Sequence, residues 1–287
     1  MQKRAFSLIE LSIVVIIISV LIAGIFMGSG LIKNARLSNA RSHTAKSVIL
    51  DTQGLISWYE TTTKNSFNPG QTFDEKQLTS WLSIAPGATV GLTNKNKLTK
   101  VATSDVVYVE NGINNLPSIQ FTGTSSNNFK LEKFYQGSSA QNTIFFVFRP
   151  ENISLKTIID SYSGTYSVTI KDADEVTLNA GSSVDTNTIT DAANFTASQN
   201  YIMAVYFDGN SSRVYINDAI TVIGNSNLNV GSNELTGLTI GSNASNSNNF
   251  NGLISEVIIF NRVIKLQERK DIMNYLSTKY KISVSGL

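Results

Sequence analysis

The stretch FSLIELSIVVIIISVLIAGIFM, residues 6–27, is almost wholly apolar and contains no proline. It is long enough to cross the hydrocarbon core of a bilayer, which needs about 20 residues. A chain in lipid must satisfy its own backbone hydrogen bonds, so the stretch is predicted to be a helix. Glu10 is its only charged residue, and a charge in lipid costs roughly 2–3 kcal/mol or more unless it finds a partner.

The segment that follows, residues 31 to about 53, is more polar and has almost no turn signals. Its apolar side chains recur at helical spacing. We expect the first helix to continue through residue 53 and to pack one side on the next domain. These apolar positions are Leu31, Ile32, Ala35, Ala45, Val48 and Ile49.

From about Gly54 the pattern changes to short runs of alternating or wholly apolar residues, which is typical of strands. The predicted strands are 55–59, 106–109, 118–121, 143–149, 157–162, 166–170, 201–207, 213–216, 219–223, 238–240 and 253–260. Asn-Gly and Asp-Gly pairs mark predicted turns at 111–112, 208–209 and 251–252, and the second pair sits inside a predicted hairpin, 201–217. Many strands and few helices predict an antiparallel β-sandwich, with an exposed loop at 243–251.

One further helix is predicted at the end of the chain. Leu266, Ile272, Met273, Leu276 and Tyr280 fall on one side at helical spacing. The charged residues Glu268, Arg269, Lys270, Asp271 and Lys279 fall largely elsewhere. We expect this helix to cover the sandwich.

Composition excludes several classes of function. The 287 residues carry a net charge of +2, which supplies no strong field for nucleic acid, so no nucleic-acid partner is predicted. Cysteine is absent, which excludes disulfides and thiol chemistry. The single histidine, His43, lies on the predicted first helix and is expected to be solvated.

The run KRAFSLIEL, residues 3–11, resembles the prepilin leader of type IV pilins and type II secretion pseudopilins. The resemblance implies that a prepilin peptidase cuts between Ala5 and Phe6 and that the new terminus, Phe6, is N-methylated. Residues 1–5 would then be the leader, 6–53 a pilin-like helix and 54–287 the exported domain. The family strongly prefers glycine where this chain has Ala5.

Glu10 would become the fifth residue of the processed chain. Its carboxylate pairs poorly with its own helix terminus, so we expect the Phe6 ammonium of a neighbouring subunit to meet it and to set the register of assembly. Two other interpretations remain open: Glu10 reaches the headgroups of a plain membrane anchor, or the segment is an ordinary secretory signal. Lysines and arginines after the span outnumber those before it, so the positive-inside rule alone does not decide orientation. The pilin resemblance implies a cytoplasmic N-terminus at the bacterial inner membrane, with the β domain periplasmic or extracellular.

The rest of the chain resembles the bacterial concanavalin A-like or laminin-G-like jelly roll. The resemblance rests on GLISWY (54–59), TSWL (79–82), LPSIQFTG (116–123), TIFFVFRP (143–150) and GLISEVIIFNR (252–262), followed by a helix. The implied fold is mainly β: a long N-terminal helix, an antiparallel jelly-roll sandwich and a C-terminal helix. By position, Trp58 and Trp81 are expected in the core, and Glu256 is either a buried partner of Arg262 or faces solvent.

No catalytic residue is predicted, and the chain is not expected to be an enzyme. Glycosidases of this fold pair carboxylates on one strand, whereas the acidic cluster 172–175 resembles a hairpin turn. No cofactor is predicted either. Calcium is the open alternative, since laminin-G-like domains often hold it; the candidate ligands are Asp160, Asp172, Asp174, Asp208 and Asn210. Sugar-stacking candidates are Trp58, Trp81, Tyr135, Tyr162 and Tyr166.

We therefore expect a minor pilin or pseudopilin of a type IV pilus or type II secretion system. Its expected partners are other pilin-like subunits, a prepilin peptidase, inner-membrane lipid and a surface glycan or protein. The ligand-binding residues are not predicted. The alternatives are a membrane-anchored binding module without filament assembly and a tethered glycan-active enzyme.

Overall fold

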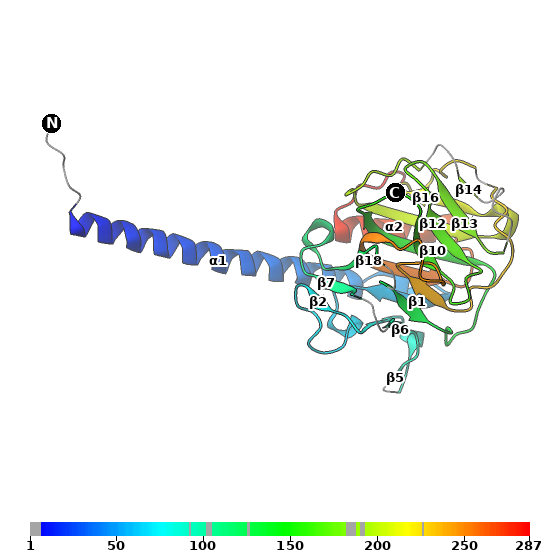
Figure 1. Cartoon of the computed structure of the whole chain (residues 1–287), viewed down its shortest axis with the longest axis horizontal. Coiled ribbons are helices and arrows are strands. Elements are labelled where there is room, and N and C mark those ends of the chain that lie inside the picture. Colours follow the sequence, from blue (N-terminus) through cyan, green and yellow to red (C-terminus); the bar gives the residue numbers. More distant parts are fainter. Residues whose placement is uncertain are drawn as a thin grey trace.

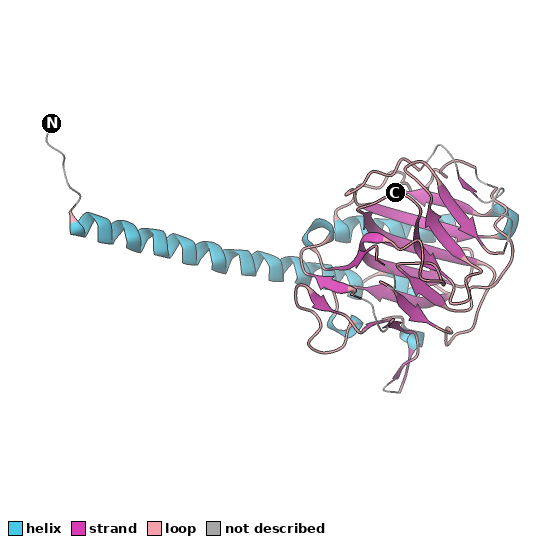
Figure 2. Cartoon of the chain, in the orientation of Figure 1, coloured by secondary structure: helices cyan, strands magenta, loops and turns pink. Residues whose placement is uncertain are grey.

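A computed structural model describes residues 7–91, 93–101, 105–124, 127–181, 188–189, 193–225 and 227–287. It shows one long helix, α1, that projects from a β-sandwich, with the C-terminus on the sandwich (Figure 1). Strands dominate the domain and helices cover one side of it (Figure 2). The predicted class, mainly β with an N-terminal and a C-terminal helix, is confirmed.

Helix α1 spans Leu8–Ala45. The prediction that it continues to residue 53 is wrong: the helix ends at Lys46, and a short 3-10 turn, η1 (Val48–Asp51), follows. The Ser47 hydroxyl accepts a hydrogen bond from the Ile49 N–H. Ser47 therefore caps the start of η1, and α1 does not continue past it. Over the residues that the structure describes, no helix combines the length and the apolar character needed to cross a membrane.

Two sheets of eight strands each form the sandwich, and all their pairings are antiparallel over the described residues. The first has the order β16-β15-β10-β18-β8-β7-β2, and β1 also pairs with β18. Its strands are β1 (Leu55–Glu60), β2 (Lys76–Gln77), β7 (Val107–Val109), β8 (Ser118–Thr122), β10 (Asn142–Pro150), β15 (Tyr201–Phe207), β16 (Arg213–Ile216) and β18 (Asn251–Phe260).

The second sheet has the order β14-β13-β12-β11-β17-β9-β6-β3. Its strands are β3 (Ser80–Leu82), β6 (Lys97–Lys100), β9 (Phe129–Leu131), β11 (Lys156–Asp160), β12 (Ser167–Ile170), β13 (Val176–Asn179), β14 (Thr188–Ile189) and β17 (Leu238–Ile240). A separate small hairpin joins β4 (Thr89–Val90) to β5 (Thr93–Asn94).

The first sheet is buried on both faces, which explains its wholly apolar central strands. Along β10, Ile144, Phe146 and Phe148 enter the core between the sheets. Phe145 and Val147 point the other way, into a second core under helix α2 (Leu266–Tyr280). The end of α1 reaches this second core through Ala40, so both helices lie against the same sheet.

Helix α2 was predicted correctly in place, but three of its residues, Leu266, Arg269 and Lys279, were assigned to the wrong side. Arg269 is buried, with its guanidinium over the Tyr215 ring. Ile272, Met273 and Leu276 are buried as expected. Leu266 is instead 51% exposed, because it begins the helix beyond the edge of the core. Lys279, expected to lie largely outside, has a fully buried side chain because two carboxylates meet it there.

Two further local predictions are wrong. Residues 219–223 form no strand, because the Asp218 carboxylate accepts the N–H groups of Ile220 and Thr221 and so satisfies this backbone locally. The pair 251–252 is not a turn but the start of β18, where Gly252 allows close strand approach: a Cβ there would lie 2.1 Å from the Arg149 oxygen.

Candidate functional site

The N-terminal segment carries the processing and assembly residues predicted from the sequence. Ala5 and Phe6 lie outside the described residues. Glu10 lies in the first turn of α1, where its Oε2 accepts a hydrogen bond from the Ser7 N–H at 2.9 Å. The Ser7 hydroxyl in turn accepts from the Ile9 N–H at 3.2 Å, which completes a capping box. The expectation that Glu10 pairs poorly with its own Phe6 ammonium stays a prediction, because Phe6 lies outside the described residues.

No other described part of the chain covers the first half of α1. Its large apolar side chains from Leu8 to Ile22 are exposed by 48–85%. An apolar surface of this extent marks a surface that contacts lipid or other protein. The second half of the helix differs, because it contacts the domain.

Polar contacts attach this second half of α1 to the domain. Lys33 forms an ion pair with Glu110. Arg41 Nε donates to the Thr62 oxygen at 2.7 Å. Thr44 is buried and accepts a hydrogen bond from Lys279 Nζ at 2.9 Å. The last contact leads into a group of buried charges.

We call Lys279, Glu60, Glu256, Tyr275 and Tyr280 the buried junction. Lys279 comes from α2, Glu60 from the end of β1 and Glu256 from the middle of β18. Glu60 and Glu256 lie directly opposite each other in the β1–β18 register. Two like charges in this position repel. Lys279 Nζ lies 3.0 Å from Glu60 and 2.8 Å from Glu256, so it neutralises part of that repulsion.

Both carboxylates are saturated with hydrogen-bond donors. Besides Lys279, Glu256 accepts from Trp58 Nε1 at 2.7 Å and from the Tyr275 and Tyr280 hydroxyls, each at 2.9 Å. Glu60 accepts two backbone N–H bonds, from Thr62 and Thr63. It also accepts two hydroxyl bonds, from Thr62 and Ser66. Buried charges persist only with this kind of pairing and hydrogen bonding.

The junction shifts the pKa values of its members in different directions. Burial alone would raise the pKa of Glu60, but the Lys279 ammonium and the hydrogen bonds from Thr62 and Thr63 outweigh it and lower that pKa to about 2. Burial raises the pKa of Glu256, and Lys279 offsets this only in part. Burial would lower the pKa of Lys279, yet the two carboxylates raise it well above its ordinary value.

This arrangement fixes geometry; it is not suited to catalysis. Lys279, Glu60 and Glu256 have side chains at most 1% exposed, so a substrate has no access to them. The junction links both helices to the first sheet: α2, β1 and β18 supply its members, and Thr44 of α1 accepts a hydrogen bond from Lys279. Glu256 is buried, as one of its two sequence interpretations expected, but the expected partner is wrong. Glu256 pairs with Lys279, and Arg262 pairs with Glu268 at 2.5 Å. A signal for Lys279 was present, since it follows Ile272 and Leu276 at helical spacing.

The calcium candidates are scattered. Asp160 is buried, its Oδ2 accepts from the Ala244 N–H at 2.9 Å, and burial raises its pKa. Asp172 accepts two backbone N–H bonds within the predicted 172–175 hairpin turn, which is confirmed. Asp208 contacts Gln141 and Arg213. Within the described ranges, no three His, Asp or Glu side chains are grouped as metal ligands.

Of the sugar-stacking candidates, two are exposed. Trp58, Trp81 and Tyr166 are fully buried, which confirms the core positions predicted for the tryptophans. Tyr135 is 57% exposed and Tyr162 44% exposed.

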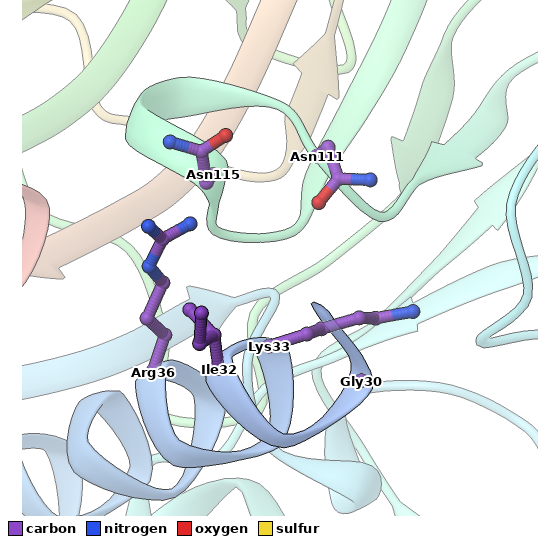
Figure 3. Close-up of a pocket in the computed structure, with 6 residues that line it drawn as sticks. All are labelled: Gly30, Ile32, Lys33, Arg36, Asn111 and Asn115. Carbon is purple, nitrogen blue, oxygen red and sulfur yellow. The ribbon is translucent and has the colours of Figure 1, made fainter. Parts of the chain in front are cut away.

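A cleft of about 350 Å³ lies between α1 and the loop before β8 (Figure 3). Its lining includes Ile32, Lys33 and Arg36 from the helix and two asparagine side chains, Asn111 and Asn115, from the loop.

Comparison with known proteins gives two family matches. Residues 122–268 match the concanavalin A-like lectin/glucanases superfamily. Residues 1–26 match the prokaryotic N-terminal methylation motif. No curated protein matches this sequence.

Solved structures share the fold of the domain at low sequence identity. Trypanosoma rangeli sialidase in complex with sialic acid is 12% identical, with a TM-score of 0.52, over 80% of this chain and 34% of the sialidase chain. Domain 4 of an extracellular arabinanase from Geobacillus stearothermophilus, in complex with arabinotriose, is 16% identical over 76% of this chain and 97% of that domain, with a TM-score of 0.43. The chain spans about a third of the length of the sialidase chain. At 12% identity, the similarity to the sialidase describes the fold alone.

Proposed function

The chain belongs to the concanavalin A-like lectin/glucanases superfamily and carries the prokaryotic N-terminal methylation motif, and from this premise we propose that it is a minor pilin or pseudopilin that displays a glycan- or protein-binding domain. The observation that carries the proposal is the position of the motif. It stands at the far end of α1, the helix whose apolar first half projects from the sandwich (Figure 1).

Processing is the first step of this function. A prepilin peptidase cuts between Ala5 and Phe6, releases residues 1–5 and leaves a Phe6 terminus that is then methylated. The methylation motif at residues 1–26 supports this step. The segment 6–27 inserts in the bacterial inner membrane with its N-terminus in the cytoplasm, and the domain from residue 54 lies on the other side.

Assembly with other pilin-like subunits is the second step. In the single chain the Glu10 carboxylate caps its own helix through the Ser7 N–H. In an assembly, the Phe6 ammonium of a neighbour is a stronger partner for this carboxylate, because both groups are charged. Glu10 therefore caps its own helix in the single chain and fixes the register between neighbouring helices in the assembly.

The domain serves display. The buried junction holds α1 against the sandwich, so the domain keeps one orientation relative to the helix on which assembly depends. Members of this fold include lectins that carry out no reaction. The acidic cluster 172–175 is engaged in its own turn, which supports binding over glycan hydrolysis. The function requires no cofactor.

Terminal mass spectrometry of the membrane-extracted protein tests the proposal. We expect a chain that begins at Phe6 and carries one added methyl group. Crosslinking between subunits in cells should be lost in Glu10→Gln and kept in Ser12→Ala, a matched change of a polar residue two positions along the same helix. An intact Met1, or crosslinking that survives Glu10→Gln, would contradict it.

A further inference from the structure

The cleft between α1 and the 111–115 loop combines an open helix face with polar side chains. Arg36 rises from the helix towards Asn115, and Asn111 lies on the same side of the cleft (Figure 3). A volume of about 350 Å³ is within the range of small-molecule sites. The cleft is therefore large enough to receive a polar group from outside the chain.

Arg36 differs from the other basic residues of this part of the helix. Lys33 pairs with Glu110, and Arg41 donates to the Thr62 oxygen. Among the described residues, Arg36 has no ion-pair or hydrogen-bond partner, and its side chain is exposed. Residues 28–50 carry four lysines and arginines and no aspartate or glutamate. The cleft thus presents an uncompensated positive charge.

The chemistry of this lining fits a phosphate. A guanidinium offers planar pairs of N–H donors that match phosphate oxygens, and it does so better than an ammonium. The amides of Asn111 and Asn115 add donors for phosphate and acceptors for hydroxyl groups. A phosphodiester that carries a polyol satisfies both kinds of group.

The position of Arg36 along α1 indicates where such a phosphate comes from. At 1.5 Å per residue, Leu8 and Arg36 are about 42 Å apart along the helix. This equals the thickness of a bilayer with its headgroups, which is about 40–45 Å. If α1 inserts as the proposed function requires, Arg36 lies at the headgroup level of the outer leaflet, and Ile32, one turn nearer the apolar half, lies towards the acyl chains.

We propose that this cleft binds the headgroup of an anionic phospholipid, with Arg36 on the phosphate and Asn111 and Asn115 on the headgroup oxygens. The proposal rests on the membrane insertion in the proposed function. Lipid is favoured over a second copy of the chain, because the cleft lies between α1 and the 111–115 loop, at the headgroup level when α1 is inserted. Binding here holds the domain against the membrane surface before assembly.

Native mass spectrometry of the full chain, with an equal mixture of phosphatidylglycerol and phosphatidylcholine, tests the site. We expect phosphatidylglycerol to be retained about five-fold more, since one basic residue near an anionic surface contributes roughly that factor. Arg36→Gln should bring the ratio close to one. Lys46→Gln removes the same charge from an exposed position near the end of α1, outside the cleft, and should keep the preference. Unchanged urea midpoints for both variants show that they fold.

Other outcomes overturn the proposal. Equal retention of the two lipids by the unaltered chain removes it, and so does an equal loss of preference in Lys46→Gln, which would make the effect one of charge alone. Displacement of the bound lipid by glycerol 3-phosphate would assign the cleft to a soluble phosphate. Loss of subunit crosslinking in Arg36→Gln, with the lipid ratio unchanged, would assign it to a second copy. A chain that enters vesicles of neither composition contradicts the proposed function itself; one that enters both without preference contradicts only this site.

Discussion

Replacement of Lys279 by methionine is the sharpest test of how the helix and the domain are joined. Methionine keeps the length and the apolar stem of the side chain but removes the ammonium. Glu60 and Glu256 then lie opposite each other in a buried site, with their hydroxyl and N–H donors but with no positive charge. Removal of one partner of a buried ion pair costs about 3–5 kcal/mol.

That magnitude is large compared with the stability of a domain, which is about 5–15 kcal/mol. For a domain of this size, unfolding in urea has a slope of about 2–3 kcal/mol per molar, so the urea midpoint should fall by about 1–2 M. The melting temperature should fall by about 10 °C or more. Trp58 reports the change directly, because its indole N–H donates to Glu256.

The assay is urea unfolding of the full chain in mild detergent, followed by tryptophan fluorescence. Lys270→Met, a change of a half-exposed lysine on the same helix, is the control and should move the midpoint little. In Lys279→Met, burial without a positive charge raises the pKa values of both carboxylates. Protonation then removes the buried negative charge, so the loss of unfolding free energy relative to the unaltered chain should shrink as the pH falls from 7 to 4. If Lys279→Met lowers the free energy of unfolding by less than about 1 kcal/mol, or by an amount that does not change with pH, the role given to the junction is refuted.

Three shorter predictions concern the rest of the domain. The folded pKa of Glu60 is about 2, against an ordinary value of 4.5, so its stabilisation is complete above pH 4.5 and is lost as the pH falls towards 2; urea midpoints of Glu60→Gln should change less across that window. Gly241→Ala should lower the free energy of unfolding by about 2–3 kcal/mol, because φ is +93° and the new Cβ would lie 2.3 Å from the Phe121 ring. Gly209→Ala, with φ +56° and open space around the new Cβ, should lower it by about 1 kcal/mol. Arg269→Leu should lower the free energy of unfolding, measured by thermal melting, by about 2 kcal/mol, because it removes a guanidinium that lies 3.7 Å from the Tyr215 ring centroid and donates to the Ala219 oxygen. Arg213→Leu, at a partly exposed site, should lower it less.

Local patterns account for the parts of the fold that were predicted correctly. The hairpin formed by β15 and β16 was predicted from two apolar runs around Asp208-Gly209, and it is confirmed. The short polar strands were missed. Strand β6, Lys97–Lys100, buries only Leu98, and its pairing with β3 and β9 joins segments that are distant in sequence. Such pairing leaves no periodicity in a short window.

The two candidate sites also differ in how far apart their residues lie in the sequence. The N-terminal methylation motif could be recognised from the sequence because its residues are contiguous, and the roles of Ala5, Phe6 and Glu10 stay predictions. The buried junction was not found, and Lys279 was placed on the wrong side of its helix, because hydropathy alone assigns a lysine to solvent. Its two carboxylates are far away in sequence, and nothing local indicates that they share one site.

The order of residues alone determined that an apolar, singly charged helix precedes a β-sandwich, since each of these features depends on side chains within one or two turns or within one strand. The tertiary structure alone decided that Glu60 and Glu256 lie opposite each other. It also decided that Lys279 pairs with both carboxylates and donates to Thr44 of α1. The reason is physical: a buried charge is stable only where its partners converge, and that convergence is set by the pairing of β1 with β18 and by the docking of α2.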